Sequence, residues 1–121
     1  MNRIEIATTF LQMASSGAVR EAYDKYIHAG FKHHNGYFKG DRESLMKGME
    51  EAHETTPNEF LEVKRTFENE NSVAVHSHVR QMNGNDIAVV HIFRFEGEKI
   101  IELWDVGMIV PKDLPNNNGI F

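Results

Sequence analysis

The C-terminal half of the chain carries histidines and one aspartate inside segments that are otherwise apolar. His91 lies in the segment VVHIFRF, Asp105 in IIELWDV and His76 in VAVHSHV. A buried carboxylate is costly unless it is paired, so an aspartate and histidines among apolar residues indicate a functional site rather than ordinary core. Imidazole and carboxyl groups are the usual general acids and bases near neutral pH. These three residues are therefore candidates for acid–base catalysis.

The segments that carry these residues have the alternation of β-strands. From residue 60 onward apolar and polar residues alternate, and turn sequences interrupt the pattern at residues 69–71, 83–84 and 96–98. Asn-Gly between two alternating segments, as at the second of these turns, is a strong hairpin signal. The pattern predicts four antiparallel strands joined as a meander.

Loop length determines which residues face each other across a hairpin. A two-residue Asn-Gly loop places His76 opposite His91, and a three-residue Glu-Gly-Glu loop places His91 opposite Asp105. The three side chains then form a row on one face of the sheet. The same register brings Arg94 opposite Glu102, and this cross-strand ion pair supports the register independently.

The face that carries the row predicts a pocket. The same register puts Phe95 opposite Ile101 on that face, and we expect His78, Phe93 and Leu103 there to line a substrate-binding site. A face that is this apolar needs cover, so we expect the helices to pack on it and the pocket to lie between helices and sheet.

The opposite face of the predicted sheet is also apolar. It carries a stripe of large residues: Ile92, Ile100, Trp104, Val106 and Met108. A solvated face would be polar, so the stripe predicts that a second copy of the chain covers it, as a homodimer through the sheet.

Three helices are expected before the strands. Apolar residues recur at steps of three and four over residues 2–15, from 19 to about 28, and from Asp41, a candidate N-cap, to about residue 55. The linker FKHHNGYFKG lies between the second and third helices. Helices followed by strands indicate an α+β fold, with three N-terminal helices packed on a curved antiparallel sheet in one domain of residues 1–121.

Composition limits the functions that the chain can have. Its 121 residues include 13 Lys and Arg against 18 Asp and Glu, a formal charge of −5, which makes a nucleic-acid partner a poor fit. No apolar run is long enough to span a bilayer, and there is no cysteine. We expect a soluble, cytoplasmic protein without nucleic-acid or membrane partners.

No cofactor or metal is expected. The chain has no P-loop, no dinucleotide-binding fingerprint and no nucleophilic serine or cysteine motif. Two histidines and one carboxylate are the ligands of some non-haem iron sites, so a metal site is an alternative interpretation of these residues. Its ligands would have no helical i, i+4 spacing and no familiar motif, which favours chemistry by the side chains alone.

The order of helix, helix, loop, helix and antiparallel meander resembles the NTF2-like cone fold. Within it, VAVHSHV, IFRFEGEKIIELWDV and the closing PKDLPNNNGIF resemble the SnoaL-like polyketide cyclases. The pattern R-F-x-x-x-K-I-x-E-x-W-D is the most specific part of this resemblance. It covers nearly the whole chain and implies an α+β cone.

The resemblance also implies roles for single residues. In those cyclases the aspartate at the position of Asp105 is the general acid–base of an intramolecular aldol closure, and a histidine at the position of His91 lies beside it. His34 and Asn35 correspond to the His-Asn pair of the loop after the second helix, so they are expected to bind substrate. Leu103 stands where relatives often carry a histidine, which implies a more apolar pocket.

Two functions follow from these observations. The first is a cofactor-independent enzyme that isomerises or cyclises a small apolar carbonyl compound. In it Asp105 abstracts the proton beside the carbonyl, while His91 and His76 tune the carboxylate or polarise an oxygen. The alternative is a non-catalytic module of the same superfamily that binds a small molecule or dimerises.

Overall fold

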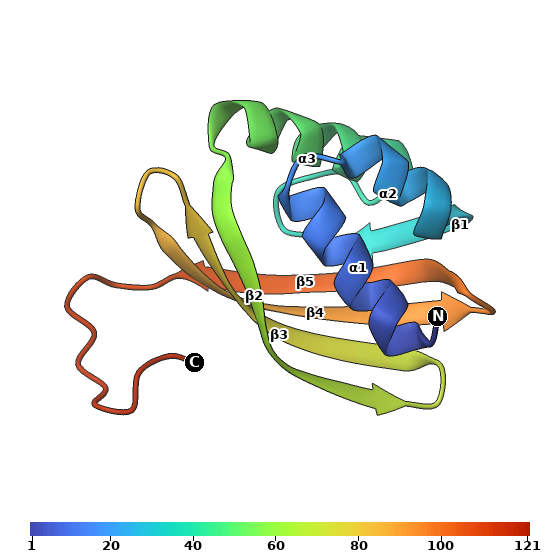
Figure 1. The fold of residues 1–121 in the computed structure, drawn as a ribbon. Coiled ribbons are helices and arrows are strands. Elements are labelled where there is room, and N and C mark those ends of the chain that lie inside the picture. Colours follow the sequence, from blue (N-terminus) through green and yellow to red (C-terminus); the bar gives the residue numbers. More distant parts are fainter.

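Three helices cover one face of a curved five-stranded sheet in a computed structural model that describes residues 1–121 (Figure 1). The elements follow in the order α1 (Arg3–Ser15), α2 (Val19–Tyr26), β1 (Ile27–His34), α3 (Arg42–Thr55), β2 (Asn58–Asn69), β3 (Ser72–Gln81), β4 (Asp86–Glu96) and β5 (Lys99–Ile109). The strand order across the sheet is β1-β5-β4-β3-β2. The predicted α+β class, with N-terminal helices packed on a curved sheet, is confirmed.

Local capping explains where α1 and α3 begin. Asn2 and Glu5 form a capping box, in which each side chain bonds the other's backbone N–H, at 2.8 and 3.2 Å. Asp41 caps α3 as predicted and accepts a hydrogen bond from the backbone N–H of Ser44 at 3.0 Å.

None of the three helices has the length and apolar content that a membrane crossing requires.

The strand β1 was not predicted from the sequence. The helix expected to reach residue 28 ends at Tyr26, and Ile27 already pairs with Ile100 of β5. The predicted linker therefore begins as a strand, parallel to β5, with His33 opposite Leu103. Pairing with the exposed edge of β5 outweighs the weak helical periodicity of this segment. The sheet is thus mixed rather than wholly antiparallel.

The predicted register between β3 and β4 is wrong by one residue. His76 lies opposite Val90, and His91 lies opposite Val75. The backbone N–H of Met82 donates to Pro57 at the start of β2, so it cannot close a two-residue loop across the hairpin. A shift of one residue moves every side chain of a strand to the other face. His76 therefore lies on the face away from the helices, and the expected row of three residues does not form.

The predicted register between β4 and β5 is confirmed at the site. His91 lies opposite Asp105, and Arg94 lies opposite Glu102, with 2.9 Å between the guanidinium and the carboxylate. Beyond Arg94 a bulge shifts the pairing, so Phe95 faces Ile100 instead of Ile101. Ile100 is consequently fully buried in the core and does not belong to the apolar stripe on the opposite face.

The core holds the strand of His91 against the helices. Phe10 of α1, Tyr23 of α2 and Phe93 of β4 are fully buried, and the ring centroid of Phe10 lies 5.6 Å from that of Tyr23 and 6.0 Å from that of Phe93. Removing one such ring typically costs about 3–5 kcal/mol of unfolding free energy. This packing fixes the position of His91, two residues from Phe93 along β4.

Candidate functional site

The carboxylate of Asp105 is held by Asn35 on one side and lies beside His91 on the other. The side-chain amide of Asn35, just after β1, donates to Oδ2 of Asp105 at 2.9 Å. The same amide's oxygen accepts from the backbone N–H of Tyr37 at 2.7 Å, which orients the NH₂ group toward the carboxylate. Nε2 of His91 lies 3.7 Å from Oδ1, too far for a hydrogen bond. Oδ1 is thus left available for chemistry.

His91 is the more buried partner of the pair. Its residue is 8% exposed, whereas the side chain of Asp105 is 20% exposed. Burial lowers the pKa of His91 below its ordinary value, and the nearby charge of Asp105 only partly opposes this effect. The imidazole is therefore neutral at neutral pH. It can donate one hydrogen bond and accept another, but its Nδ1 has no partner within the protein.

Asp105 opens onto a hollow between the loop after β1 and the ends of β4 and β5. This loop-side hollow has a volume of about 550 Å³, and its ten lining residues include Asn35, Tyr37, Val89, Asp105 and Gly107. Asp105 is the only ionisable group among them apart from the phenol of Tyr37. Gly107 adds no side chain on the sheet face beside Asp105, where a Cβ would lie 3.2–3.3 Å from β4 atoms. The missing side chain keeps this hollow open.

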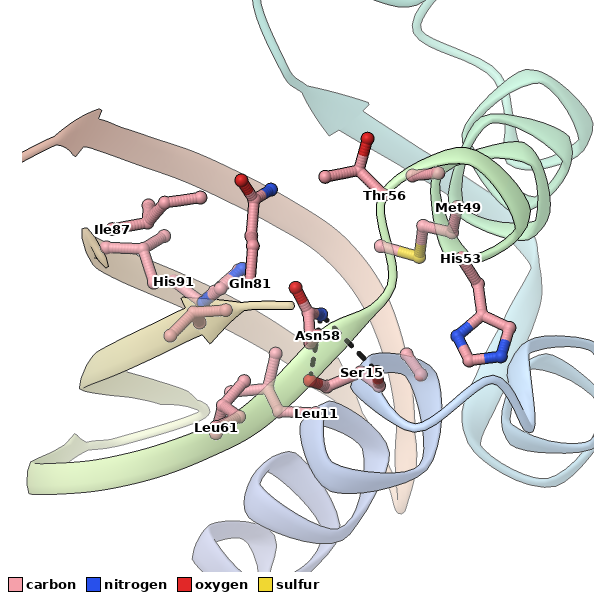
Figure 2. Close-up of a pocket in the computed structure, with 14 residues that line it drawn as sticks. Leu11, Ser15, Met49, His53, Thr56, Asn58, Leu61, Gln81, Ile87 and His91 are labelled. Atoms are coloured by element: carbon pink, nitrogen blue, oxygen red, sulfur yellow. Dashed lines mark hydrogen bonds between the residues drawn. The ribbon is translucent and has the colours of Figure 1, made fainter. Parts of the chain in front are cut away.

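A second hollow lies between the helices and the sheet and reaches His91. This helix-side hollow has a volume of about 240 Å³ and shares Ile87 and Val89 with the loop-side hollow. Met49 projects from α3 toward the sheet there (Figure 2). Eight of its 14 lining residues are hydrophobic, and the polar ones are Ser15, His53, Thr56, Asn58, Gln81 and His91. The two hollows therefore adjoin at the pair of His91 and Asp105, and no Lys or Arg lines either of them.

His34, predicted to bind substrate, lies on the outer face of the sheet instead. Its ring stacks on Trp104 with centroids 4.9 Å apart, and its Nε2 lies 2.7 Å from the carboxylate of Glu102. Burial acts to raise the pKa of Glu102, but hydrogen bonds with His34 and Arg94 outweigh it, and the net pKa is lowered. His34 thus belongs to an ion network rather than to the site of Asp105.

His76 and His78 also lie on the outer face. Nε2 of His78 lies 2.7 Å from Asp86, which accepts a second hydrogen bond from Arg80 at 2.8 Å. These two hydrogen bonds lower the pKa of Asp86 to about 2, and the bond from Arg80 makes the larger contribution. Phe121 stacks on His78 with centroids 4.2 Å apart. Neither histidine is near the hollows, so the roles predicted for them at the site have no structural support.

The two apolar candidates lie on the correct face but deeper than expected. Phe93 and Leu103 are both completely buried in the core, at 0% solvent exposure, and neither lines a hollow. The described residues contain no group of three or more His, Asp or Glu side chains that could hold a metal ion. His91 and Asp105 stand as a pair.

Sequence reasoning missed the polar residues of the helix-side hollow and the opening at Gly107. Asn58 and Gln81 line that hollow from β2 and β3, and Asn58 also donates to Ser15 at 3.1 Å. The sequence pattern assigns neither of these two residues a role. The one available signal was two uncharged amides at strand ends beside apolar residues, which is too common to identify a pocket.

Comparison with known proteins supports the fold. No protein-family model matches the chain, and no curated protein matches it in sequence. Among solved structures, an NTF2-like protein of unknown function from Cytophaga hutchinsonii matches with a TM-score of 0.72 and 19% identity, over 89% of this chain and 91% of that one. TsrD from Streptomyces laurentii matches with a TM-score of 0.72 and 15% identity, over 88% and 90%.

A third similar solved structure has a fold described as ketosteroid isomerase-like. It is a hypothetical protein with a ketosteroid isomerase-like fold from Catenulispora acidiphila, in complex with trimethylamine, with a TM-score of 0.69 and 16% identity over 87% of this chain and 86% of that one. Identities this low establish a shared fold and leave function to the site itself. The chain therefore has the NTF2-like, ketosteroid isomerase-like fold that its sequence motifs resemble.

Proposed function

We propose that the protein is a cofactor-independent acid–base enzyme that abstracts the proton beside the carbonyl of a small apolar compound. The observation that carries this proposal is the carboxylate of Asp105. It is 20% exposed, bonded through Oδ2 to Asn35, and free at Oδ1 on the wall of an open hollow. A general base must be held in place yet leave one atom free to reach the proton, and this arrangement meets both conditions.

The proposed reaction needs only the chain's own groups. Oδ1 of Asp105 takes the proton from the carbon next to the carbonyl, and the electron pair of that C–H bond forms the C=C bond of an enolate. The neutral imidazole of His91, 3.7 Å from Oδ1, can donate a hydrogen bond from Nε2 to the enolate oxygen. Asp105 then returns the proton to another carbon, which isomerises the substrate. Alternatively, the enolate carbon attacks a second carbonyl and closes a ring, and the alkoxide that forms takes the proton from Asp105.

The linings of the hollows support an uncharged ligand. Most of their surface comes from aliphatic side chains, and no Lys or Arg lines either hollow to bind a carboxylate or phosphate. Asp105 would repel such an anion. A small ketone with an aliphatic or cyclic body fits these conditions.

Hydrogen exchange tests the proposal directly. Small cyclic ketones are incubated with the protein in deuterium oxide, and deuterium at the carbon beside the carbonyl is followed by NMR. We expect exchange above the buffer rate with the natural protein and its loss with Asp105→Asn. Asp113→Asn serves as the control, because it removes an exposed carboxylate from the C-terminal segment. Exchange that survives Asp105→Asn would show that Asp105 is not the base.

The same experiment decides the alternative function. The apolar linings would also suit a module that binds a small molecule without reacting. If the ketones bind to the natural protein and to Asp105→Asn equally, and neither protein exchanges their protons, the site is a binding site only. Ligand-induced chemical-shift changes at His91 and Asn35 measure that binding.

A further inference from the structure

Two buried polar side chains next to the site have no hydrogen-bond partner. Oγ of Ser77 on β3 and Nδ1 of His91 on β4 are both buried without a partner, and only two other side-chain atoms, in His33 and Arg42, share that state. Ser77 has 0% exposure. A buried hydroxyl or imidazole nitrogen that remains unbonded destabilises the fold, so such groups are rare in native proteins and call for an explanation.

The strand register makes Ser77 and His91 diagonal neighbours. Ser77 lies opposite Val89, His91 lies opposite Val75, and both side chains point to the helix-covered face. Diagonal neighbours on adjacent antiparallel strands are about 7–8 Å apart at the backbone, and their side chains can reach toward each other. A direct contact after side-chain rotation, or one bridging water, would join the two groups.

The side chains nearest to Ser77 across and along the strands offer its hydroxyl no hydrogen-bond partner. The residues that surround Ser77 are the apolar Val63 on β2, Val79 on β3 and Val89 on β4. A hydroxyl is both a donor and an acceptor, whereas a neutral imidazole has one nitrogen of each kind. The two unpartnered atoms therefore complement each other chemically.

We propose that Ser77 is a positioning residue whose hydroxyl donates to Nδ1 of His91, directly or through one buried water, and thereby keeps the imidazole proton on Nε2, facing Asp105. Which nitrogen of a histidine carries the proton is determined by the bond that the other nitrogen makes. Ser77, His91 and Asp105 then form a polar line across β3, β4 and β5. Its consequence for proton transfer rests on the proposed function, whereas the contact itself does not.

Nitrogen NMR of the ligand-free protein tests this contact. In protein labelled with ¹⁵N-histidine near neutral pH, we expect His91 to show a protonated Nε2 and an unprotonated Nδ1 that accepts a hydrogen bond. In Ser77→Ala, Nδ1 loses that bond, its resonance moves further toward that of a free unprotonated nitrogen, and the Nε2–H tautomer loses population. Loss of a bond that stabilises the neutral ring also raises the pKa of His91 relative to that in the natural protein.

Two further variants separate the contact from packing. Val75→Ala truncates the side chain directly opposite His91 without removing a hydroxyl, and Ser77→Thr keeps the hydroxyl. We expect Val75→Ala to leave the tautomer unchanged and Ser77→Thr to restore it. The proposal is overturned if the natural protein carries the proton on Nδ1, if Ser77→Ala leaves the Nδ1 resonance unchanged, or if Val75→Ala shifts it equally. Because no substrate is present, failure of the proposed catalysis leaves this result unaffected.

Discussion

Replacing His91 by leucine should change how the stability of the fold depends on pH. Burial lowers the pKa of His91 in the folded protein below the ordinary value of 6.5, the value expected in the unfolded chain. Between those two pKa values the unfolded chain binds a proton that the folded protein does not. Acidification through this range therefore favours unfolding of the natural protein. His91→Leu has no such proton to bind, so it lacks this part of the pH dependence.

The size of the effect follows from the unfolded pKa alone when the folded imidazole stays neutral. With the pKa of the unfolded chain, the cost of keeping His91 unprotonated is RT ln(1 + 10^(pKa − pH)), which is negligible near pH 7.5 and grows to about 1 kcal/mol near pH 5.5. His91 is 8% exposed, so solvent screening reduces this figure little. We expect the free energy of unfolding of the natural protein, relative to that of His91→Leu, to fall by about 1 kcal/mol between these two conditions.

Urea denaturation followed by circular dichroism measures this difference at each pH. Other titrating groups contribute to both proteins and cancel in the comparison. His28→Gln, at the start of β1, controls for the loss of a histidine elsewhere in the sheet. If the stability difference between the natural protein and His91→Leu is the same at both pH values, or if it shifts in favour of the natural protein on acidification, the burial argument is refuted.

Four shorter predictions concern the site and its surroundings. Asp105→Asn removes the charge that opposes burial, so the pKa of His91 should fall further, and an NMR titration showing a rise would contradict this. Gly107→Val should fill the loop-side hollow and abolish ketone binding while circular dichroism remains native. Val106 is 68% exposed in the outer stripe, so light scattering should detect a dimer that Val106→Glu dissociates; a monomeric natural protein would disprove the dimer. The lowered pKa of Asp86 stabilises the fold above about pH 4, so the advantage over Asp86→Asn should vanish as pH falls toward 2, and a constant advantage would argue against its ion pairs.

The pairing of His91 with Asp105 was predicted correctly although the predicted loop length was wrong, because a bulge in the structure compensates for the difference. The prediction used a three-residue loop, whereas the structure has Glu96 opposite Lys99 and one extra residue in a bulge after Arg94. Both arrangements advance the register by the same amount, so all pairs beyond the bulge agree. At the β3–β4 hairpin nothing compensates, because the backbone of Met82 bonds to β2.

Asn35 and His34 show the same limit for adjacent residues. Their His-Asn motif identified Asn35, whose amide does bond to Asp105 at 2.9 Å. It could not separate their roles, because the motif lies at the end of a strand that the sequence did not predict. His34 is still within β1 and points to the outer face beside Trp104, whereas Asn35 follows the strand and turns toward the carboxylate.

Sequence patterns alone determined the helix cap at Asp41, the order of the three helices and of the last four strands, and the pairing of His91 with Asp105. These depend on spacing and on contacts within a few residues, which the sequence displays directly. Only the tertiary structure decided that β1 joins β5, that His76 leaves the site, and that two hollows adjoin at His91. Those features arise from hydrogen bonds and packing between distant segments, where a shift of one residue reverses the face of a whole strand.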